Sequence, residues 1–233
     1  NILSPEEVGA YIMTGTWSTK ALKEAKRCSK SISIWEDPLH QSVPQEKLQS
    51  NATYIHYTSN NTIYGTQFHH TPTLETHTVV DMSSDICSRR INVADFDVIY
   101  AGAQKNLGPS GVTAVILSPW AIEQSRKNDS IRDGGIPSML SYALMASKNS
   151  MFNTPNTFGI FALERMLAWL ENLGGVDVIE QENNQKATLI YRELDSSDFW
   201  KPHAHPSARS KMNITWRITK TELEPVFLQE AAQ

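Results

Sequence analysis

Short apolar runs separated by amphipathic stretches recur along this chain. The runs that predict β-strands lie at 9–13, 31–35, 53–57, 78–81, 98–101, 112–117 and 212–218. Residues 18–27, rich in Ala, Lys, Leu and Glu, predict a helix, and apolar residues recur on one helical face in 160–170 and 176–194. A last capping pattern at Thr221 and Glu224 predicts a final helix. Strands interleaved with helices predict an α/β fold.

The first eight residues do not fit this pattern smoothly. Ser4 and Glu7 have the spacing of a capping box, and Pro5 suits the first position of a helix, so a helix is predicted to begin here. The strand predicted from Gly9 follows at once. Because a helix of four residues cannot sustain itself, this junction indicates that something is missing.

Composition narrows the classes of function. The 233 residues carry a formal net charge of −4 and no basic stripe, so nucleic acid is not an expected partner. No apolar run is long enough to span a bilayer, and the polar start carries no signal peptide, so we expect a cytoplasmic protein. Cys28 and Cys87 have no metal-ligand spacing, which predicts reduced thiols and no metal site.

Two side chains carry the candidate chemistry. Asp81 and Lys105 each lie at or just after the end of a predicted strand, and ligands of open α/β sheets bind at that edge. A carboxylate can keep a pyridine nitrogen protonated, and an amine can condense with an aldehyde, so the pair fits pyridoxal phosphate. Taken alone, a lysine after a strand is also typical of a solvated loop.

The residues around this pair strengthen the first interpretation. Residues 99–111, IYAGAQKNLGPSG, closely resemble the Schiff-base segment of the phosphoserine aminotransferase family. Further segments resemble other family motifs: 14–18 and 23–25, 56–65, 80–84 with 88–89, 153–158 and 209–214. The resemblance covers nearly the whole chain.

The resemblance implies a role for each matching residue. Lys105 would be the catalytic lysine, forming the Schiff base and moving the proton between the substrate and the cofactor. The implied cofactor ligands are Asp81 at the pyridine nitrogen, Trp17 stacked on the ring, Thr62 at the phenolic oxygen, Gln104 at the phosphate, and Asn153 and Thr154 at the phosphate bound in the neighbouring subunit. Core packing for Trp17, and a helix cap for Asn153 and Thr154, are the plainer interpretations.

The resemblance also implies a fold and an activity. The fold would be that of a fold-type-I pyridoxal-phosphate transferase. A large domain over 9–180 would carry a mainly parallel seven-stranded sheet, and a smaller C-terminal α/β domain over 181–233 would include residues 1–8. The enzyme would be a homodimer with shared active sites. It would transfer an amino group between glutamate and 3-phosphohydroxypyruvate, giving O-phosphoserine and 2-oxoglutarate in serine biosynthesis.

Parts of the family pattern are not found. About eighty to ninety residues, including a Gly-Gly loop for the cofactor phosphate, are expected between Val8 and Gly9, and a C-terminal strand with a substrate-binding arginine is expected after Gln233. Either residues are omitted from the chain at Val8, or the chain is a shortened relative. The second case leaves open a catalytically impaired or non-catalytic protein that retains the fold and dimer interface.

A different enzyme of the same fold type, such as a cysteine desulfurase, is a weaker interpretation. Those enzymes need a reactive cysteine on a loop, and the sequence around Cys28 and Cys87 does not suggest one.

Overall fold

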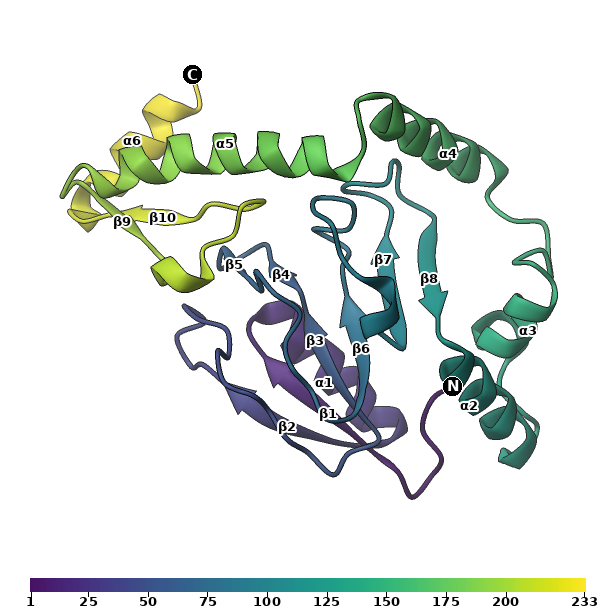
Figure 1. Cartoon of the computed structure of the whole chain (residues 1–233). Helices are drawn as coiled ribbons and strands as arrows, with labels where there is room; N and C mark the ends of the chain where they lie inside the picture. Colours follow the sequence, from purple (N-terminus) through teal and green to yellow (C-terminus); the bar gives the residue numbers. More distant parts are fainter.

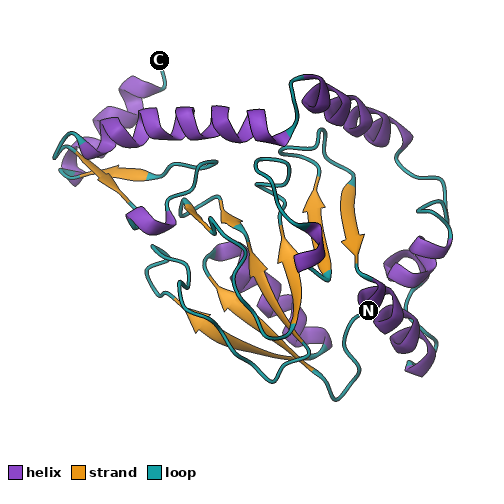
Figure 2. Ribbon diagram, in the orientation of Figure 1, coloured by secondary structure: helices purple, strands orange, loops and turns teal.

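The computed structural model describes residues 1–233 and is built around one mixed sheet (Figures 1 and 2). Its six strands are β1 (Val8–Met13), β2 (Lys30–Glu36), β3 (Tyr54–Thr58), β6 (His77–Asp81), β7 (Val98–Gly102) and β8 (Thr113–Leu117). Their order is β2-β1-β3-β6-β7-β8, and every neighbouring pair is parallel except β7 with β8. The fold is therefore α/β with a mainly parallel sheet, as predicted, although the sheet has six strands and not seven.

Apolar side chains pack in two layers, one on each face of the sheet. Successive side chains of a strand point to opposite faces, so Ile55 and Ile99 enter one layer while Tyr54 and Val98 enter the other. The second layer is covered by α1 (Thr16–Cys28) and α2 (Pro119–Ile131), and the first largely by loops. Because both faces are covered, the central strands are near-continuous apolar runs, which is why the sequence marked them clearly.

The strand β8 lies at one margin of the sheet. It pairs only with β7 and runs antiparallel to it. Val115 is 37% exposed and Ile116 42% exposed, so this margin is less covered than the strands beside it.

The predicted helix start near Ser4 is wrong. Residues 5 and 6 form a turn, in which Glu7 N donates to Ser4 O at 3.1 Å and Ser4 N donates to the Glu7 carboxylate at 2.6 Å. The capping pattern closes this turn, and β1 then runs through Val8 and Gly9, which pair with consecutive residues of β2.

Residues 1–8 also do not pack against the C-terminal part of the chain, contrary to expectation. The Asn1 side chain accepts hydrogen bonds from the hydroxyl of Ser125 and the backbone N of Tyr142, and Ile2 and Leu3 join the apolar layer beneath α2.

The second half of the chain surrounds the sheet. After α2 come α3 (Tyr142–Ser147), α4 (Thr157–Asn172) and the long α5 (Val176–Asp195), which crosses the upper side of the molecule in Figure 1. The antiparallel pair of β9 (Trp200–Pro202) and β10 (Trp216–Ile218) follows, and α6 (Glu224–Ala231) comes last. In the first half of the chain, β4 (Asn60–Asn61) and β5 (Thr66–Gln67) form a separate small ribbon. Helices α2 and α3 were not predicted, and the predicted strand 212–218 is confined to β10.

We call residues 138–172 the arm.

Candidate active site

Four parallel strands end at one edge of the sheet, on the side of the molecule that α5 spans (Figure 1). The segments that leave this edge are 14–17 after β1, 59–62 after β3, 81–83 at and after β6, and 102–105 at and after β7. These segments hold Trp17, Thr62, Asp81, Gln104 and Lys105. The fold therefore brings five of the seven predicted site residues to the same edge.

Asp81 is the central acid of this edge. In register it lies between Thr58 of β3 and Tyr100 of β7, and it is half-buried. Its Oδ1 accepts a hydrogen bond from Ser83 N at 2.9 Å, while the Ser83 hydroxyl accepts one from Gly102 N at 3.1 Å. Ser83 thus ties the carboxylate to the end of β7, where the segment with Lys105 begins.

Lys105 lies on an exposed turn whose base is fixed by packing. Ala103 and Leu107 are buried on either side of it, and Leu163 of α4 packs against them. The Asn106 side chain donates to Ile86 O at 2.8 Å. These contacts anchor the turn and leave the lysine side chain in solvent.

Gln104 folds back over the end of β7. A methyl group on Gly102 would come within 2.5 Å of the Gln104 side-chain oxygen, so glycine leaves the room that this amide occupies. Gly102 therefore leaves room for the flexible Gln104 amide at the edge.

Trp17 and Thr62 are in contact with each other, on the side of β6 where β3 and β1 lie. Trp17 Nε1 donates to Thr62 Oγ1 at 3.1 Å, and the indole is 41% exposed. The two segments are also joined by Thr14 Oγ1, which donates to Asn61 Oδ1 at 3.1 Å. An aromatic face that stays open while its N–H is held is suited to stacking on a ring.

Asn153 and Thr154 lie elsewhere. Both are exposed in the arm between α3 and α4, and the hydrogen bond given by the Asn153 side chain goes to Thr154 O at 3.2 Å. A single copy of the chain does not bring them to the edge with the other five.

A buried polar network beneath the edge was not predicted. The Asp85 carboxylate accepts hydrogen bonds from the Ser59 hydroxyl and, at 3.1 Å, from Gln67 Nε2. The Asn60 side chain donates to Asn213 Oδ1 at 2.8 Å and accepts from the Ser210 hydroxyl at 2.5 Å. Burial raises the pKa of Asp85. The sequence feature that could have indicated this network is the run of small polar residues after β3 and β6.

The thiols differ from what a reactive cysteine requires. Cys28 is exposed on α1, and burial raises the pKa of the Cys87 thiol, which disfavours the thiolate. No group of three His, Cys, Asp or Glu side chains is placed to hold a metal ion, and no helix is both long and apolar enough to cross a membrane.

The donor set of the edge fits pyridoxal phosphate. It offers a carboxylate for a protonated ring nitrogen, an amine for an aldehyde, an aromatic face, a hydroxyl and an amide. A cavity of about 540 Å³ lies between β10 and α6, and one of about 380 Å³ lies against the face of the sheet near α1, where His56 and Tyr100 line it; none of the five edge residues lines either cavity.

Comparison with known proteins shows which family this chain is similar to. The family model for class-V aminotransferases matches residues 24–232. The phosphoserine aminotransferase of Lysinibacillus sphaericus is 45% identical over 238 residues, covering 99% of this chain and 64% of the relative. The structure of phosphoserine aminotransferase from Bacillus circulans is 40% identical with a TM-score of 0.89, covering 100% of this chain and 64% of that one. A PLP-bound phosphoserine aminotransferase from Trichomonas vaginalis is 29% identical with a TM-score of 0.87, covering 98% and 66%.

The alignments correct the expected gap between Val8 and Gly9. The match to the Lysinibacillus sphaericus protein has 238 positions for a chain of 233 residues, so it has no room for an insertion of eighty to ninety residues. The part of the relatives that this chain does not match lies outside the aligned stretch. The chain spans 64% of their length.

The match to the family model extends from the middle of α1 to just beyond α6 and so includes the segments that carry Asp81 and Lys105. Because it covers most of the 233 residues, this chain belongs to the class-V aminotransferase family.

Proposed function

We propose that this chain is the greater part of a pyridoxal-phosphate-dependent phosphoserine aminotransferase. The reaction would transfer an amino group between glutamate and 3-phosphohydroxypyruvate, giving O-phosphoserine and 2-oxoglutarate. The observation that carries the proposal is the meeting of Asp81 with the Lys105 turn through Ser83, in a chain 45% identical to phosphoserine aminotransferases.

Each side chain of the edge would have a distinct task. Asp81, oriented by Ser83 N, would hold the protonated ring nitrogen, and Trp17 would cover one face of the ring. Thr62 would donate to the phenolic oxygen, and Gln104 would contact the phosphate. When bound, the cofactor supplies an electron sink for the carbanion that forms at the substrate Cα.

Lys105 would act at two places. Its amine would hold the cofactor through the aldehyde carbon before the substrate arrives, and the amine set free by the substrate would carry the proton from the substrate Cα to the C4′ carbon of the cofactor. The exposed turn suits this role, because its base is fixed at Ala103 and Leu107 while the side chain can move.

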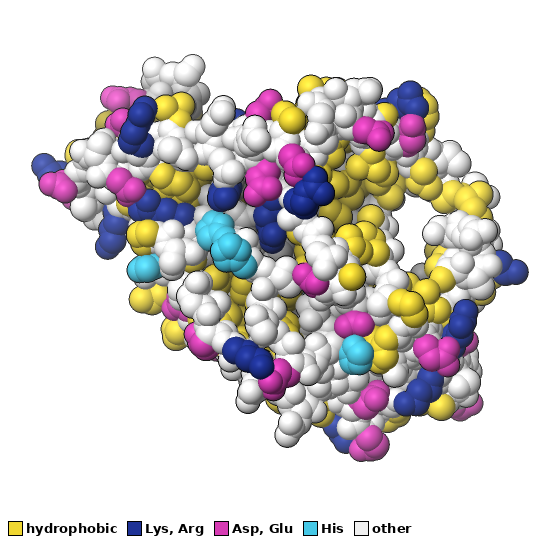
Figure 3. Space-filling view, in the orientation of Figure 1, with side chains coloured by type: hydrophobic (Ala, Val, Ile, Leu, Met, Phe, Trp, Pro, Cys, Tyr) yellow, Lys and Arg dark blue, Asp and Glu magenta, His cyan; other side chains and the backbone are white.

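The arm suggests a second copy of the chain. Its exposed large apolar side chains are Met139, Leu140, Met151, Phe152, Phe158, Ile160, Phe161, Leu167 and Trp169. Hydrophobic side chains gather at the upper right of Figure 3, where Figure 1 places α4 and the segment between α3 and α4. Patches of this kind mark protein interaction sites. In a homodimer, Asn153 and Thr154 would reach the phosphate at the partner's site.

The division into domains also belongs to this proposal. Residues 9–180 would form the cofactor-binding domain and 181–233 the smaller one. The division would fall within α5, which is continuous from Val176 to Asp195.

The alternative is a non-catalytic relative that keeps the fold. This alternative comes from the sequence, in which the Gly-Gly loop that the family resemblance implies for the cofactor phosphate is not found. Such a protein would bind the cofactor weakly, or bind it without transamination.

Borohydride reduction in the presence of pyridoxal phosphate, followed by peptide mapping, tests the proposal. We expect visible absorbance before reduction and a pyridoxyl label on Lys105, both lost in Lys105→Ala. Lys20→Ala is the matched control, because Lys20 is an exposed lysine near the same edge, 4.7 Å from the Trp17 ring centre. A label at Lys20 in place of Lys105 would refute the assignment.

Transamination separates the two functions. Protein that converts 3-phosphohydroxypyruvate in the presence of glutamate before reduction, and that carries the label on Lys105 after reduction, supports the aminotransferase. Labelling without conversion supports the non-catalytic relative.

A further inference from the structure

A buried histidine shares one face of the sheet with Asp81. Asp81 pairs in register with Thr58 on β3 and with Tyr100 on β7, and His56 is two residues before Thr58. Residues paired in register point to the same face, and residues two apart on a strand do so as well. His56, Thr58, Asp81 and Tyr100 therefore lie on one face at the end of three adjacent strands.

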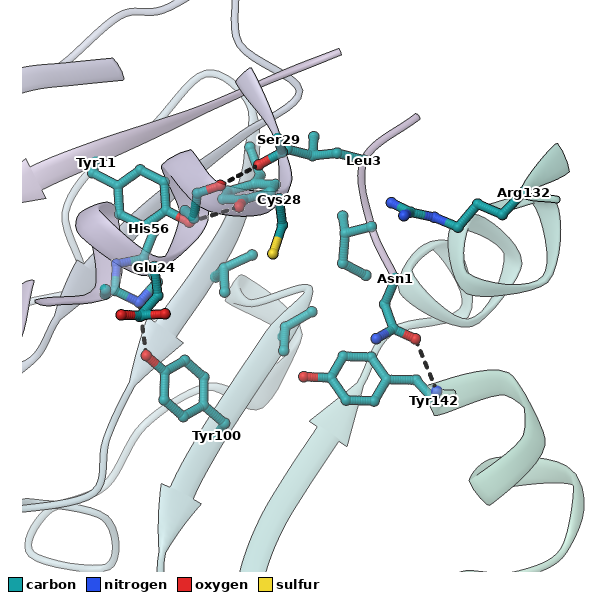
Figure 4. A pocket seen from close by; sticks show the side chains of 16 residues that line it. Asn1, Leu3, Tyr11, Glu24, Cys28, Ser29, His56, Tyr100, Arg132 and Tyr142 are labelled. Carbon is teal, nitrogen blue, oxygen red and sulfur yellow. Dashed lines mark hydrogen bonds between the residues drawn. The ribbon is translucent and has the colours of Figure 1, made fainter. Parts of the chain in front are cut away.

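His56 is anchored on one side of its ring only. It is 3% exposed, and its Nε2 lies 2.9 Å from the hydroxyl of Tyr100. The Tyr11 ring packs on it with centres 4.8 Å apart, as the close view of this region shows (Figure 4). The other nitrogen, Nδ1, is buried without a hydrogen-bond partner, and so is Thr58 Oγ1.

Two unpartnered polar atoms on the strand beside a carboxylate call for an explanation, because buried polar groups are nearly always hydrogen-bonded. A neutral imidazole has one donor and one acceptor nitrogen. The Tyr100 hydroxyl can donate to Nε2, and in that tautomer the ring hydrogen lies on Nδ1. The unused donor would then lie on the face that holds Asp81.

The electrostatics agree with a neutral ring close to a negative charge. Burial lowers the pKa of His56 to about 4, against the opposing effect of the Asp81 charge. Burial also raises the pKa of Tyr100, and the charge of Asp81 raises it further. The Asp81 charge is therefore felt by both partners of the His56–Tyr100 hydrogen bond.

We propose that His56 is a positioning residue for Asp81: held at Nε2 by Tyr100, it uses its Nδ1 side to keep the carboxylate directed toward the ring nitrogen of the cofactor. Only the direction of the carboxylate toward the ring nitrogen of the cofactor rests on the proposed function. The link between His56 and Asp81 belongs to the chain with or without cofactor.

The first experiment uses the cofactor-free chain. The ¹⁵N shifts of the His56 ring are measured by NMR at neutral pH in the wild type, in Asp81→Asn and in Asp97→Asn. Asp97 is the matched control, since its carboxylate lies 3.0 Å from Nδ1 of a different histidine, His77. We expect Asp81→Asn to move the His56 signals and Asp97→Asn to move those of His77 alone. Unchanged His56 signals in Asp81→Asn would overturn the proposal, whether or not the chain binds cofactor.

The second experiment measures the dissociation constant of pyridoxal phosphate by absorbance. Loss of a hydrogen bond to a charged group predicts binding about tenfold weaker in His56→Phe, with much of it restored in His56→Gln, which keeps a donor. Tyr11→Phe is the packing control, because its hydroxyl bonds to Tyr54 at 2.8 Å and its ring contact with His56 remains. Equal affinity in His56→Phe and the wild type would contradict the positioning role. A wild type that does not bind refutes the proposed function, and the NMR comparison still decides the inference.

Discussion

The sheet edge and the arm place their side chains in opposite ways. Behind the edge, Asn60 and Asp85 are almost fully buried and hydrogen-bonded to residues from distant parts of the chain. In the arm, Phe158 is 75% exposed and Phe161 59% exposed, although both are apolar. One region buries polar groups and the other exposes apolar ones.

This contrast separates what the chain stabilises alone from what it offers to others. Buried polar groups are tolerated only when their hydrogen bonds are satisfied, so the region behind the edge has one arrangement and holds the site residues in it. Exposed phenylalanines contribute little to the fold of the chain that carries them. They gain their stabilisation when another surface covers them.

The largest expected effect compares matched truncations in the two regions. Ile99 is 1% exposed in the sheet and Ile160 is 43% exposed in the arm. We expect Ile99→Ala to lower the free energy of unfolding by about 2–5 kcal/mol, and Ile160→Ala by less than about 0.5 kcal/mol, in dilute protein. Urea unfolding followed by circular dichroism measures both. Equal losses would show that the arm is part of the core.

Self-association of the chain should depend on the exposed apolar side chains of the arm. Replacing Phe158 and Phe161 by Ser removes two large apolar anchors, so we expect self-association to weaken by about tenfold or more. Sedimentation over a range of concentrations measures this. The matched control is the exposed Phe199, which lies outside the arm, and Phe199→Ser should leave association unchanged. An arm variant that associates like the wild type would refute the interface.

The protonation state of Asp85 should change the stability of the chain. Its pKa is raised chiefly by burial, so the folded state favours the neutral acid, and the chain loses stability as pH rises from about 4 toward the folded pKa. We expect the free energy of unfolding of the wild type to fall relative to that of Asp85→Asn as pH goes from about 4 to 7. Urea titrations at these two pH values give the difference. A difference that stays constant would contradict the raised pKa.

The smallest effect concerns an ion pair that bridges the region behind the edge and α5. Arg90 and Asp177 are bonded through two hydrogen bonds, but both side chains are more than half exposed. Exposed pairs contribute little, so Arg90→Gln should leave the urea midpoint unresolved from that of the wild type. A clear shift would show that this contact holds α5 in place.

The sequence was most informative where regular periodicity and topology decide the outcome. The central parallel strands were recognised from short apolar runs such as Val79 and Val80 in β6 and Val98 and Ile99 in β7, and parallel strands bring Asp81 and Lys105 to one edge. The network of Asp85 was missed because its members lie far apart in sequence. The turn at Ser4 was mistaken for a helix because the same Ser–Glu pair can close a turn or begin a helix.

The margin of the sheet at β8 has a practical consequence. One side of this strand has no β-partner within the chain, and a row of free amide and carbonyl groups with Val115 and Ile116 above and below it can accept a foreign strand. We expect concentrated preparations to form strand-paired aggregates through this margin. A charged residue at position 115 would be the first choice for keeping the purified chain in solution.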